Sequence, residues 1–539
     1  MSASAKSGSA AAASAASGNA KPGNAKPGNA ESSGPVVPHR AIITVCAMVA
    51  TLMQALDSTI ANVALPYMQG SLSASYDEAT WVLTSYIVAA AIMTAPVGWL
   101  AARFGFRSLY LVSVIGFTGA SMLCGLADSL AEMVVFRFVQ GMFGAALVPL
   151  SQGTMLNMYP AEQRGQAMAI WGMGVMLGPI LGPTLGGYLT ELYNWRYVFF
   201  VNLPFGIICT LGLWFFLPRA DAQRGLRFDW FGFIALAVGV AGLQLVLDRG
   251  ETQDWFGATE VILEAVAAAS GFYLFVVHML TGELTFVSPR LFRDWNLVIG
   301  FLVMFVVGML LLATTALLAP WLQLLGNDPV ETAGLLLAPR GVGTMAAMMI
   351  AGRLSNKMDA RLVMAFGVVL LSWSLWQLSR WTPAVDQWTL IVNTMVQGAG
   401  VGFVFIPLNV VAFATLDAKL RYEATAFLTL VRSIGMSMGI SIFEALVVQG
   451  TQVEHSVLAV YASPLNRAIE ASPLITHALS PMTAHGAAVL DGMITYQAQV
   501  IAYNNDFWLM AIVSAPIFLL VMLMRKPPSS SGSAPAVID

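Results

Sequence analysis

Windows of about 20 predominantly apolar residues recur along the whole chain, and they restrict the possible folds more than any other feature. Such a window is long enough to cross the hydrocarbon core of a bilayer as one helix. Fourteen can be placed in the sequence, which is 57% hydrophobic and only 10% charged. The chain is therefore predicted to be an all-α polytopic membrane protein. The windows lie at 41–62, 80–102, 107–127, 133–156, 166–189, 197–218, 230–247, 259–280, 297–318, 332–351, 361–380, 387–412, 425–449 and 505–524.

The basic residues give an independent check on the number of spans, because cytoplasmic segments of membrane proteins are enriched in Lys and Arg. If the N-terminus is cytoplasmic and the windows alternate in direction, 19 of the 26 basic residues lie in cytoplasmic segments and 4 lie on the other side. The remaining 3, Arg137, Arg340 and Arg432, lie within predicted helices. One span too many or too few near the middle would remove this asymmetry. We therefore expect 14 spans and two cytoplasmic termini.

Two sequence repeats relate the first part of the chain to the second. GWLAARFGFR at 98–107 matches GRLSNKMDAR at 352–361 in its Gly, a Leu, a basic residue and the final Arg, and VQG at 139–141 recurs at 396–398. Membrane transporters are commonly built from two related halves. The predicted organisation is a disordered cytoplasmic tail at 1–40, a six-helix bundle at 41–218, a linker with two inserted helices at 219–296, a second six-helix bundle at 297–524 that includes an extracytoplasmic loop at 450–504, and a tail at 525–539.

The fifth window contains a glycine at every fourth position, which is the spacing of one helix face. Small residues on one face let another helix backbone approach closely, and a proline removes a backbone hydrogen bond. The sequence predicts a broken, closely packed helix suited to a hinge or gate, with ordinary membrane helix packing as the alternative. The residues are Gly174, Gly178, Gly182, Gly186 and Gly187, with Pro179 and Pro183 among them.

The same stripe resembles the motif G-x-x-x-G-P-x-x-G-G of drug:proton antiporters in the major facilitator superfamily. LDSTIANVALP at 56–66 resembles the first-helix signature of the 14-helix drug exporters, and RFVQG at 137–141 and YNWRYVFFVNLP at 193–204 match the same group. The chain is thus similar to the EmrB/QacA group, with the EmrB-type pumps as the nearest branch. The resemblance implies the major facilitator superfamily fold, with 14 transmembrane helices in a 6+2+6 arrangement.

The loop after the second window departs from the usual pattern of the superfamily. The motif residues Gly98, Arg103, Gly105 and Arg107 are present, but Ala102 stands where an acidic residue is usual. The resemblance therefore implies a weaker charged latch on the cytoplasmic face, a loss that EmrB-like proteins share.

Asp57 is the principal candidate for proton coupling, because it lies in the outer half of the first predicted helix. An ionised and unpaired carboxylate at that depth is unfavourable, so Asp57 should be neutral, paired or hydrated. Arg137 lies at a similar depth in the fourth helix and is its natural partner, since an arginine keeps its charge and needs an acceptor. By resemblance, Arg137 matches a helix-4 arginine thought to assist proton transfer. The alternatives are a carboxylate that tethers a neighbouring helix and a fixed structural ion pair.

Other polar and aromatic residues within predicted helices are candidates for a substrate cavity. The 29 Met and 29 Phe residues suit a cavity that repacks around varied hydrophobic ligands, although simple membrane packing explains most of them. The cavity candidates are Gln54, Asn62, Tyr86, Gln140, Trp171, Gln397 and Asn409. The other predicted intramembrane charges are Arg340, Arg432, Glu264 and Glu444. Each arginine needs a carbonyl, a lipid phosphate or an acid, whereas the two acids lie near helix ends, where snorkelling explains them.

The extracytoplasmic loop at 450–504 is long enough to need a structure of its own. Its apolar residues at helical spacing predict a small helical cap or a partner-docking element. By resemblance to EmrB-type pumps, the partner is a periplasmic adaptor of the EmrA type that leads to a TolC-like outer-membrane channel, and the location is the bacterial inner membrane. The histidines of this loop, His455, His477 and His485, are candidates for pH sensitivity, although surface histidines usually have no such role.

No sequence pattern indicates catalysis, a metal or a cofactor. The cysteines, Cys46, Cys124 and Cys209, lie in different windows without a second ligand at metal-binding spacing. We find no nucleophile and base arrangement and no phosphate-binding glycine loop. We therefore expect a transporter rather than an enzyme, with the proton gradient as its energy source. The predicted function is proton-coupled multidrug efflux by alternating access, and the alternative is a dedicated exporter of a fatty acid, a siderophore or an endogenous metabolite.

Overall fold

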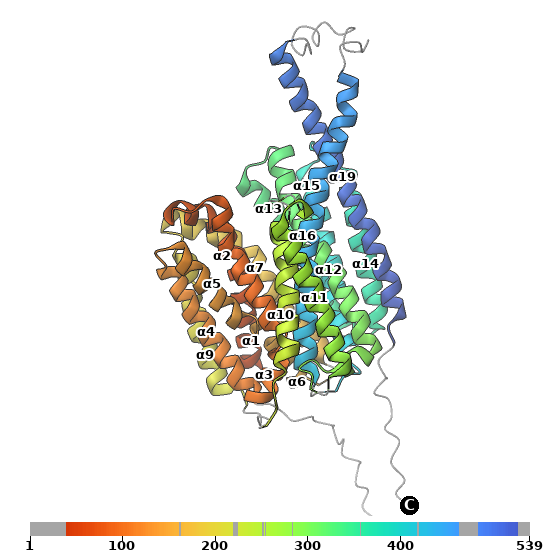
Figure 1. The fold of residues 1–539 in the computed structure, drawn as a ribbon. Helices are drawn as coiled ribbons and strands as arrows, with labels where there is room; N and C mark the ends of the chain where they lie inside the picture. Colours follow the sequence, from red (N-terminus) through yellow and green to blue (C-terminus); the bar gives the residue numbers. More distant parts are fainter. Residues whose placement is uncertain are drawn as a thin grey trace, which may run out of the picture. The chain divides into compact units, whose positions relative to one another are not determined.

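The structure, a computed structural model, describes residues 39–525 except for short segments at 161–162, 219–224, 251–252, 254, 283, 356, 418–419 and 463–482. The side chains at 63, 76–77, 179–180, 183–184 and 330–331 are also outside the description. Within this part the chain is helical throughout and contains no strand (Figure 1). The predicted tails at 1–40 and 525–539 lie almost entirely outside the described residues.

The first predicted bundle is formed by the helices that precede residue 217. Helix α1 packs along α7, α2 packs along α5, and α4 packs against both α5 and α9. The helices are α1 (Arg40–Ser71), α2 (Tyr76–Thr94), α3 (Val97–Phe104), α4 (Phe106–Leu126), α5 (Leu130–Gly144), α6 (Leu147–Met158), α7 (Arg164–Leu192), α8 (Tyr197–Phe200) and α9 (Asn202–Phe216).

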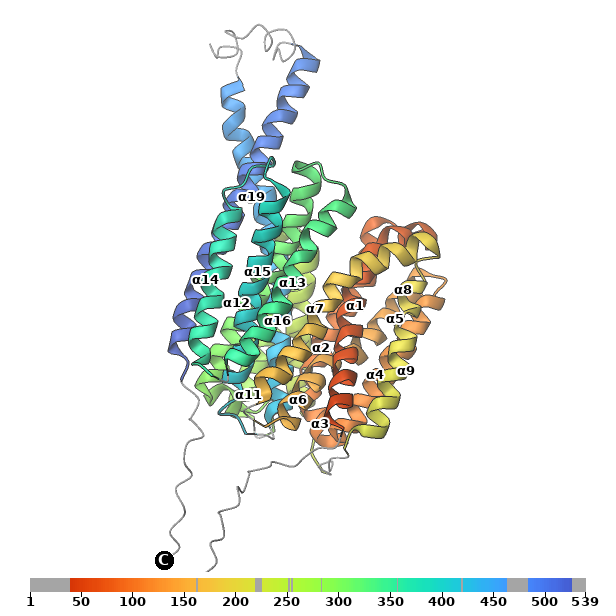
Figure 2. The ribbon, with the colours of Figure 1, turned by 180° about the vertical axis from the view of Figure 1, so that it is seen from behind.

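The second bundle repeats this arrangement. Helix α12 packs along α16, α13 packs along α15, and α14 packs against α15 and α19 (Figure 2). The helices are α12 (Trp295–Pro320), η4 (Trp321–Leu325), α13 (Val330–Leu354), α14 (Ala360–Leu378), α15 (Gln387–Ala412), α16 (Arg421–Ala459) and α19 (Ala484–Leu523).

Between the bundles in sequence, α10 (Trp230–Arg249) and α11 (Thr259–Thr281) pair with each other. Helix α10 also contacts α2 of the first bundle and α16 of the second. The short helices η2 (Trp255–Gly257) and η3 (Pro289–Arg293) flank α11.

Among the described residues, 12 helices are long and apolar enough to cross a membrane, or 13 if the bent pair of α2 and α3 counts as one span. Every predicted window falls on a helix. The fifth window corresponds to α7, which includes side chains outside the description. The count of 14 spans therefore stays a prediction.

Two of the predicted windows are interrupted next to prolines. The chain bends by 58° between α2 and α3, at Pro96, which has no backbone N–H to continue the helix. Helices α5 and α6 are likewise separated shortly before Pro149. In contrast, α7 is one continuous helix from Arg164 to Leu192, so the predicted break within it is wrong. Membrane helices tolerate proline because neighbouring groups satisfy the freed backbone atoms.

The two bundles meet closely at the end of the helices where α3 lies. A Cβ atom on Gly98 of α3 would lie 2.5 Å from the Cα atom of Glu423, so only glycine lets α3 approach α16 this closely. Nearby, the Thr425 hydroxyl donates to the Pro149 carbonyl over 3.2 Å. We call this set of residues the α3-end contact: Gly98, Pro149, Gly153, Tyr422, Glu423 and Thr425.

At the opposite end, α16 and α19 extend beyond the neighbouring helices and lie side by side (Figures 1 and 2). His455 Nε2 and Asp491 Oδ1 are 3.0 Å apart and join the two helices. The predicted extracytoplasmic cap at 450–504 thus consists, in its described part, of continuous extensions of two spanning helices. We call residues 450–462 and 483–504 the two-helix projection.

Candidate functional site

A buried ion pair lies inside the first bundle. Arg137 Nη1 of α5 is 2.7 Å from Asp57 Oδ2 of α1, and the side chains are 1% and 0% exposed, respectively. The structure therefore brings together the acid and the base that the sequence analysis singled out. Both charged groups are thus buried, and the partners described for them are protein groups.

The remaining acceptor capacity of the carboxylate is also used. Asp57 Oδ1 accepts hydrogen bonds from Gln140 Nε2 at 2.8 Å and from Asn202 Nδ2 at 3.1 Å. Asn202 in turn donates to the Ser121 hydroxyl at 3.0 Å. An ionised Asp57 is thus held by three donors from two further helices, which offsets the desolvation of a buried carboxylate.

The guanidinium of Arg137 is equally well surrounded. Its Nε donates to the Val82 carbonyl at 3.1 Å and its Nη1 donates to Gln140 Oε1 at 2.9 Å. Its central carbon lies 4.3 Å from the centre of the Tyr86 ring and 5.6 Å from that of Phe199, which are distances at which a cation is attracted to an aromatic face. Protonation of Asp57 would remove the only carboxylate among these partners.

Local helix geometry explains this convergence. Arg137 and Gln140 are three residues apart on α5, so they lie on the same helix face. Asn202 is the first residue of α9, where the chain enters the bundle. The arrangement holds a charge pair in the buried interior of the first bundle.

The glycine stripe of α7 faces α1. A Cβ on Gly174 would meet Met48, one on Gly178 would meet Ala55, and one on Gly182 would meet Thr59. The Thr59 hydroxyl also donates to the Gly178 carbonyl at 3.3 Å. These three glycines therefore let α7 pack backbone to backbone on the helix that carries Asp57.

The other residues of the stripe behave differently. A Cβ on Gly187 would have no neighbour within 4 Å, so close packing does not require glycine there. Gly186 is buried. The side chain of Pro183 lies outside the described residues.

The four loop-motif residues lie on α3, at its junction with α4 and in the first turn of α4, and they have separate roles. Gly98 belongs to the α3-end contact. Gly105 has a backbone φ of +81°, a conformation that favours glycine. Arg107 donates to the Trp214 carbonyl of α9, and Arg103 lies half-buried in the last turn of α3. Among these four motif residues, Gly98 is the one with a described contact to the second bundle.

The predicted substrate-cavity residues do not line one common cavity in the described part of the chain. Gln140 is part of the ion-pair network, and Gln54 Nε2 lies 3.5 Å from the Tyr86 hydroxyl beside it. Asn62 is exposed. Gln397 is fully buried, and neither atom of its amide has a partner among the described residues.

Two further cavity candidates lie near the boundary between the bundles. Asn409 of α15 accepts a hydrogen bond from Gln152 of α6 and so bridges the bundles. Trp171 of α7 is fully buried, and its ring nitrogen donates to the Thr51 hydroxyl at 3.0 Å. Its ring stacks on Phe405 of α15 with 6.2 Å between ring centres.

The two predicted intramembrane acids, Glu264 and Glu444, lie on α11 and α16. Glu264 lies in the second turn of α11, and its Oε1 pairs with Arg249 Nη1 at 3.3 Å, while its Oε2 is buried without a partner among the described residues. Glu444 is half-buried within α16 and does not lie near its end, because α16 continues to Ala459.

Three polar residues were missed by the sequence analysis. Asn202 stands in the YNWRYVFFVNLP motif, so its position next to a helix start was a usable signal. Ser121 gave no signal, because serines are common in membrane helices. Asp506 of α19 was overlooked although it is an acid within an apolar window; it is 5% exposed and its Oδ2 has no hydrogen-bond partner among the described residues.

Comparison with known proteins now identifies the family. Residues 47–440 match the family model of the Major Facilitator Superfamily. The chain belongs to this superfamily. Within the superfamily it is 34% identical over 489 residues to the multidrug export protein EmrB of Haemophilus influenzae, covering 90% of this chain and 96% of that protein.

Two further relatives align over a similar share of the chain. EmrB of Escherichia coli is 34% identical, with 91% of this chain and 96% of that protein covered. The fatty acid resistance protein FarB of Neisseria gonorrhoeae is 31% identical, with 91% and 97% covered. The chain is accordingly a multi-pass membrane protein of the EmrB-type branch.

Solved structures of the superfamily share the fold at low sequence identity. The human organic anion transporter MFSD10 superposes with a TM-score of 0.57 at 13% identity, covering 90% of this chain and 100% of that one. The proton:xylose symporter XylE gives a TM-score of 0.56 at 13% identity, covering 90% and 96%. These likenesses establish the fold alone.

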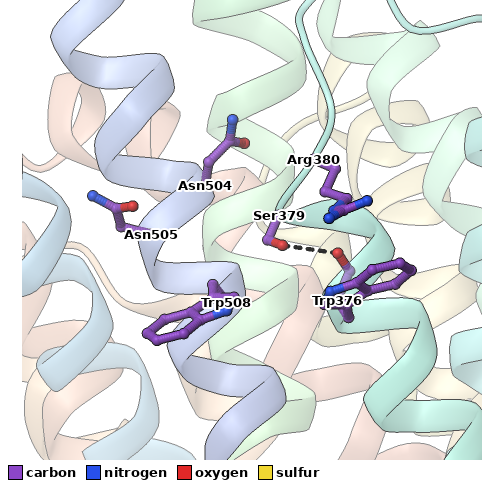
Figure 3. Close-up of a pocket in the computed structure, with 6 residues that line it drawn as sticks. All are labelled: Trp376, Ser379, Arg380, Asn504, Asn505 and Trp508. Atoms are coloured by element: carbon purple, nitrogen blue, oxygen red, sulfur yellow. Dashed lines mark hydrogen bonds between the residues drawn. The ribbon is translucent and has the colours of Figure 1, made fainter.

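A surface pocket of about 410 Å³ lies between α14 and α19, far along the chain from the ion pair (Figure 3). The Arg380 guanidinium lies over the Trp376 ring at 4.3 Å, and Trp508 is 54% exposed. Tryptophan and arginine at helix ends are typical of the membrane–water interface. The pocket contains none of the predicted substrate residues; it is lined by Trp376, Ser379, Arg380, Asn504, Asn505 and Trp508.

Proposed function

We propose that this member of the superfamily is a proton-coupled efflux transporter that exports hydrophobic compounds by alternating access. The single observation that most supports proton coupling is the buried pair of Asp57 and Arg137. A carboxylate in a membrane interior, paired with one fixed cation, changes the local charge when it binds a proton. The similarity to EmrB proteins supports multidrug efflux.

In the proposed cycle, Asp57 takes a proton from the outer side and releases it to the cytoplasm. Protonation neutralises the carboxylate and leaves Arg137 with neutral partners, so the interior of the first bundle gains a net positive charge. That change favours a different packing of the bundles and shifts the conformational equilibrium. The close seam between α1 and α7, made by Gly174, Gly178 and Gly182, keeps the ion pair sealed from the side of α7.

The α3-end contact corresponds to a closed cytoplasmic side in this scheme. Its release would open the space between the bundles to the cytoplasm, where a hydrophobic substrate enters. The proton gradient is the energy source, and no cofactor is required.

The proposed location is the bacterial inner membrane, with both termini in the cytoplasm. The distribution of basic residues supports this orientation. The two-helix projection then lies in the periplasm, where a periplasmic adaptor of the EmrA type and a TolC-like outer-membrane channel would complete the export route. The similarity to EmrB over nearly the full length of both proteins supports such a partnership.

A dedicated exporter of fatty acids is the second candidate. It is supported by the 31% identity to FarB, which is named for resistance to fatty acids. The two candidates differ in substrate range and not in the transport cycle.

The test is transport by the purified full-length protein in proteoliposomes with an imposed pH gradient. A fluorescent hydrophobic cation and an uncoupler-like weak acid report export, and the wild type is compared with Asp57→Asn. The variant is expected to lose gradient-driven transport and to retain substrate binding, because the amide cannot exchange a proton.

Asp128→Asn is the matched control, since this acid is 87% exposed and pairs only with Arg196 at the protein surface. Its transport should equal that of the wild type. Gradient-driven transport that persists in Asp57→Asn would remove Asp57 from the mechanism. Wild-type transport that ignores the gradient would contradict proton coupling as a whole.

A further inference from the structure

Arg432 of α16 is a cation without a counter-charge. Among the described residues its guanidinium makes no hydrogen bond and no ion pair, and its Nε is buried without a partner. Its one described contact is with the Phe405 ring of α15, at 5.9 Å from guanidinium carbon to ring centre. Arg432 is half-buried, and a contact at that distance contributes at most modestly to its stability.

The position of Arg432 on α16 places it at the boundary between the bundles. Thr425, in the α3-end contact, donates to the Pro149 carbonyl of the first bundle. Arg432 follows seven residues later, which is two helical turns and about 10 Å along the same helix face. The face of α16 that meets the first bundle at the α3 end therefore continues to Arg432.

An aromatic pair from both bundles lies next to this guanidinium. Phe405, which Arg432 contacts, stacks on Trp171 of α7 with an angle of 17° between the rings. Trp171 is held in place by its hydrogen bond to Thr51 of α1. A charged head and a flat apolar surface thus adjoin each other where the bundles meet.

No acid of the second bundle is placed to neutralise Arg432. Helices α12, α14 and α15 contain no Asp or Glu, α13 contains only Glu331, in its first turn, and no described ion pair joins Arg432 to Asp506, the buried acid of α19. On α16 itself, the nearest acids are Glu423 and Glu444, nine and twelve residues away, which is more than 10 Å along the helix.

A second arginine in this bundle increases the excess of positive charge. Arg340 of α13 is 8% exposed, and its hydrogen-bond acceptors are the Thr315 hydroxyl at 2.6 Å and the Leu311 carbonyl at 2.8 Å, both on α12. Leu311 lies one turn from Gly308, whose Cβ position would be 3.1 Å from Arg432 Cγ. Two guanidinium groups therefore flank one stretch of α12 without a carboxylate.

We propose that Arg432 binds the acidic head group of an amphiphilic organic anion, and that Phe405 and Trp171 receive its apolar part. This inference rests on the proposed export function and specifies the substrate class. A guanidinium forms bidentate hydrogen bonds with a carboxylate, and an anion of this kind supplies the counter-charge that no described residue gives Arg432. A neutral compound of the same shape lacks that interaction and binds more weakly.

The test is equilibrium binding, which needs neither transport nor a pH gradient. Radiolabelled dodecanoate and its neutral methyl ester are measured on the full-length protein in lipid nanodiscs, with empty nanodiscs subtracted. The wild type should prefer dodecanoate over the ester. Arg432→Gln should weaken dodecanoate binding by about 10- to 100-fold, the range expected for a charge-assisted bidentate contact, and leave the ester unchanged. Arg380→Gln removes one positive charge at the surface pocket and should change neither affinity.

Equal binding of dodecanoate and ester by the wild type would overturn the proposal, as would unchanged dodecanoate binding in Arg432→Gln. If Arg432→Gln does not fold, phenylglyoxal labelling of the wild type decides instead. Dodecanoate should protect Arg432 and not Arg380 from the reagent, and absence of protection would overturn the site. A failure of the proton-coupling test with Asp57→Asn leaves these binding results intact, so the two proposals fail separately.

Discussion

The first bundle holds its interior arginine in an ion pair, whereas no ion pair is described for either of the two interior arginines of the second bundle. Arg137 has Asp57 at 2.7 Å and neutral partners on every other side. Arg340 has only a hydroxyl and a carbonyl, and Arg432 has only an aromatic ring. The two halves are related by a sequence repeat, so this difference is a specialisation within a shared scaffold.

The comparison indicates a division of labour. Protonation of the carboxylate in an ion pair neutralises the anion and leaves the arginine charge unbalanced. An uncompensated cation responds to an anion that arrives from outside the protein. In the proposed cycle, the first bundle would bind the proton and the second the anionic substrate, which are the two binding events of coupled exchange.

The largest expected effect comes from removing one arginine in each half. Arg137→Met leaves Asp57 as a buried anion without a cation and should lower the free energy of unfolding by about 3–5 kcal/mol. Arg432→Met removes a charge that has no described partner, and it should change the free energy of unfolding by about 1 kcal/mol or less. Unfolding by SDS titration in mixed micelles, followed by tryptophan fluorescence, measures both. Equal losses would show that Arg432 is compensated in the unliganded protein and would break the comparison.

The repeat-related glutamines give a smaller and equally direct contrast. Gln140→Leu removes a donor to Asp57 and an acceptor for Arg137, and should cost about 1–3 kcal/mol. Gln397→Leu removes an amide whose two polar atoms have no described partner, so the variant should be as stable as the wild type or more stable. The same unfolding assay applies. A large loss in Gln397→Leu would reveal a hidden partner in the second bundle.

The smallest effect is expected for the acid on α19. Asp506 Oδ2 is buried without a hydrogen bond, so Asp506→Leu should raise the free energy of unfolding by up to about 1 kcal/mol. Asp57→Leu should lower the free energy of unfolding, because it leaves the buried Arg137 without its carboxylate partner. Thermal denaturation monitored by circular dichroism at 222 nm suffices for this pair. A drop in Asp506→Leu similar to that in Asp57→Leu would indicate that α19 carries a second compensated site.

Much of the fold followed from the sequence because membrane spans are long and apolar. Each predicted window coincides with a described helix or with a pair of consecutive helices, and α10 and α11 lie between the two repeat-related parts of the chain. The interruption at Pro96 and the continuity of α7 through its prolines were not predictable, because tertiary neighbours decide whether a proline breaks a membrane helix. The reach of α16 to Ala459 was missed because its last turns are no longer apolar.

The ion pair was predictable and its surroundings were not. Asp57 and Arg137 stand out because charges are rare in apolar windows, and equal depth suggested their pairing. The donors Asn202 and Ser121 carry no charge and come from distant helices, so their convergence required the tertiary structure. The isolation of Arg432 is likewise a property of its neighbours: the sequence indicates the charge but not the absence of a partner.

The continuity of α16 has a mechanical consequence. The helix runs without interruption from Arg421 to Ala459, 39 residues, or about 58 Å. Tyr422 and Thr425 at one end belong to the α3-end contact, Arg432 lies two turns further on, and His455 at the other end holds the two-helix projection together. One continuous helix therefore connects the α3-end contact, Arg432 and the two-helix projection. A tilt of α16 that releases the α3-end contact must also displace the projection. The orientation of the two-helix projection would therefore change when the α3-end contact opens, and a protein bound to the projection would experience that change.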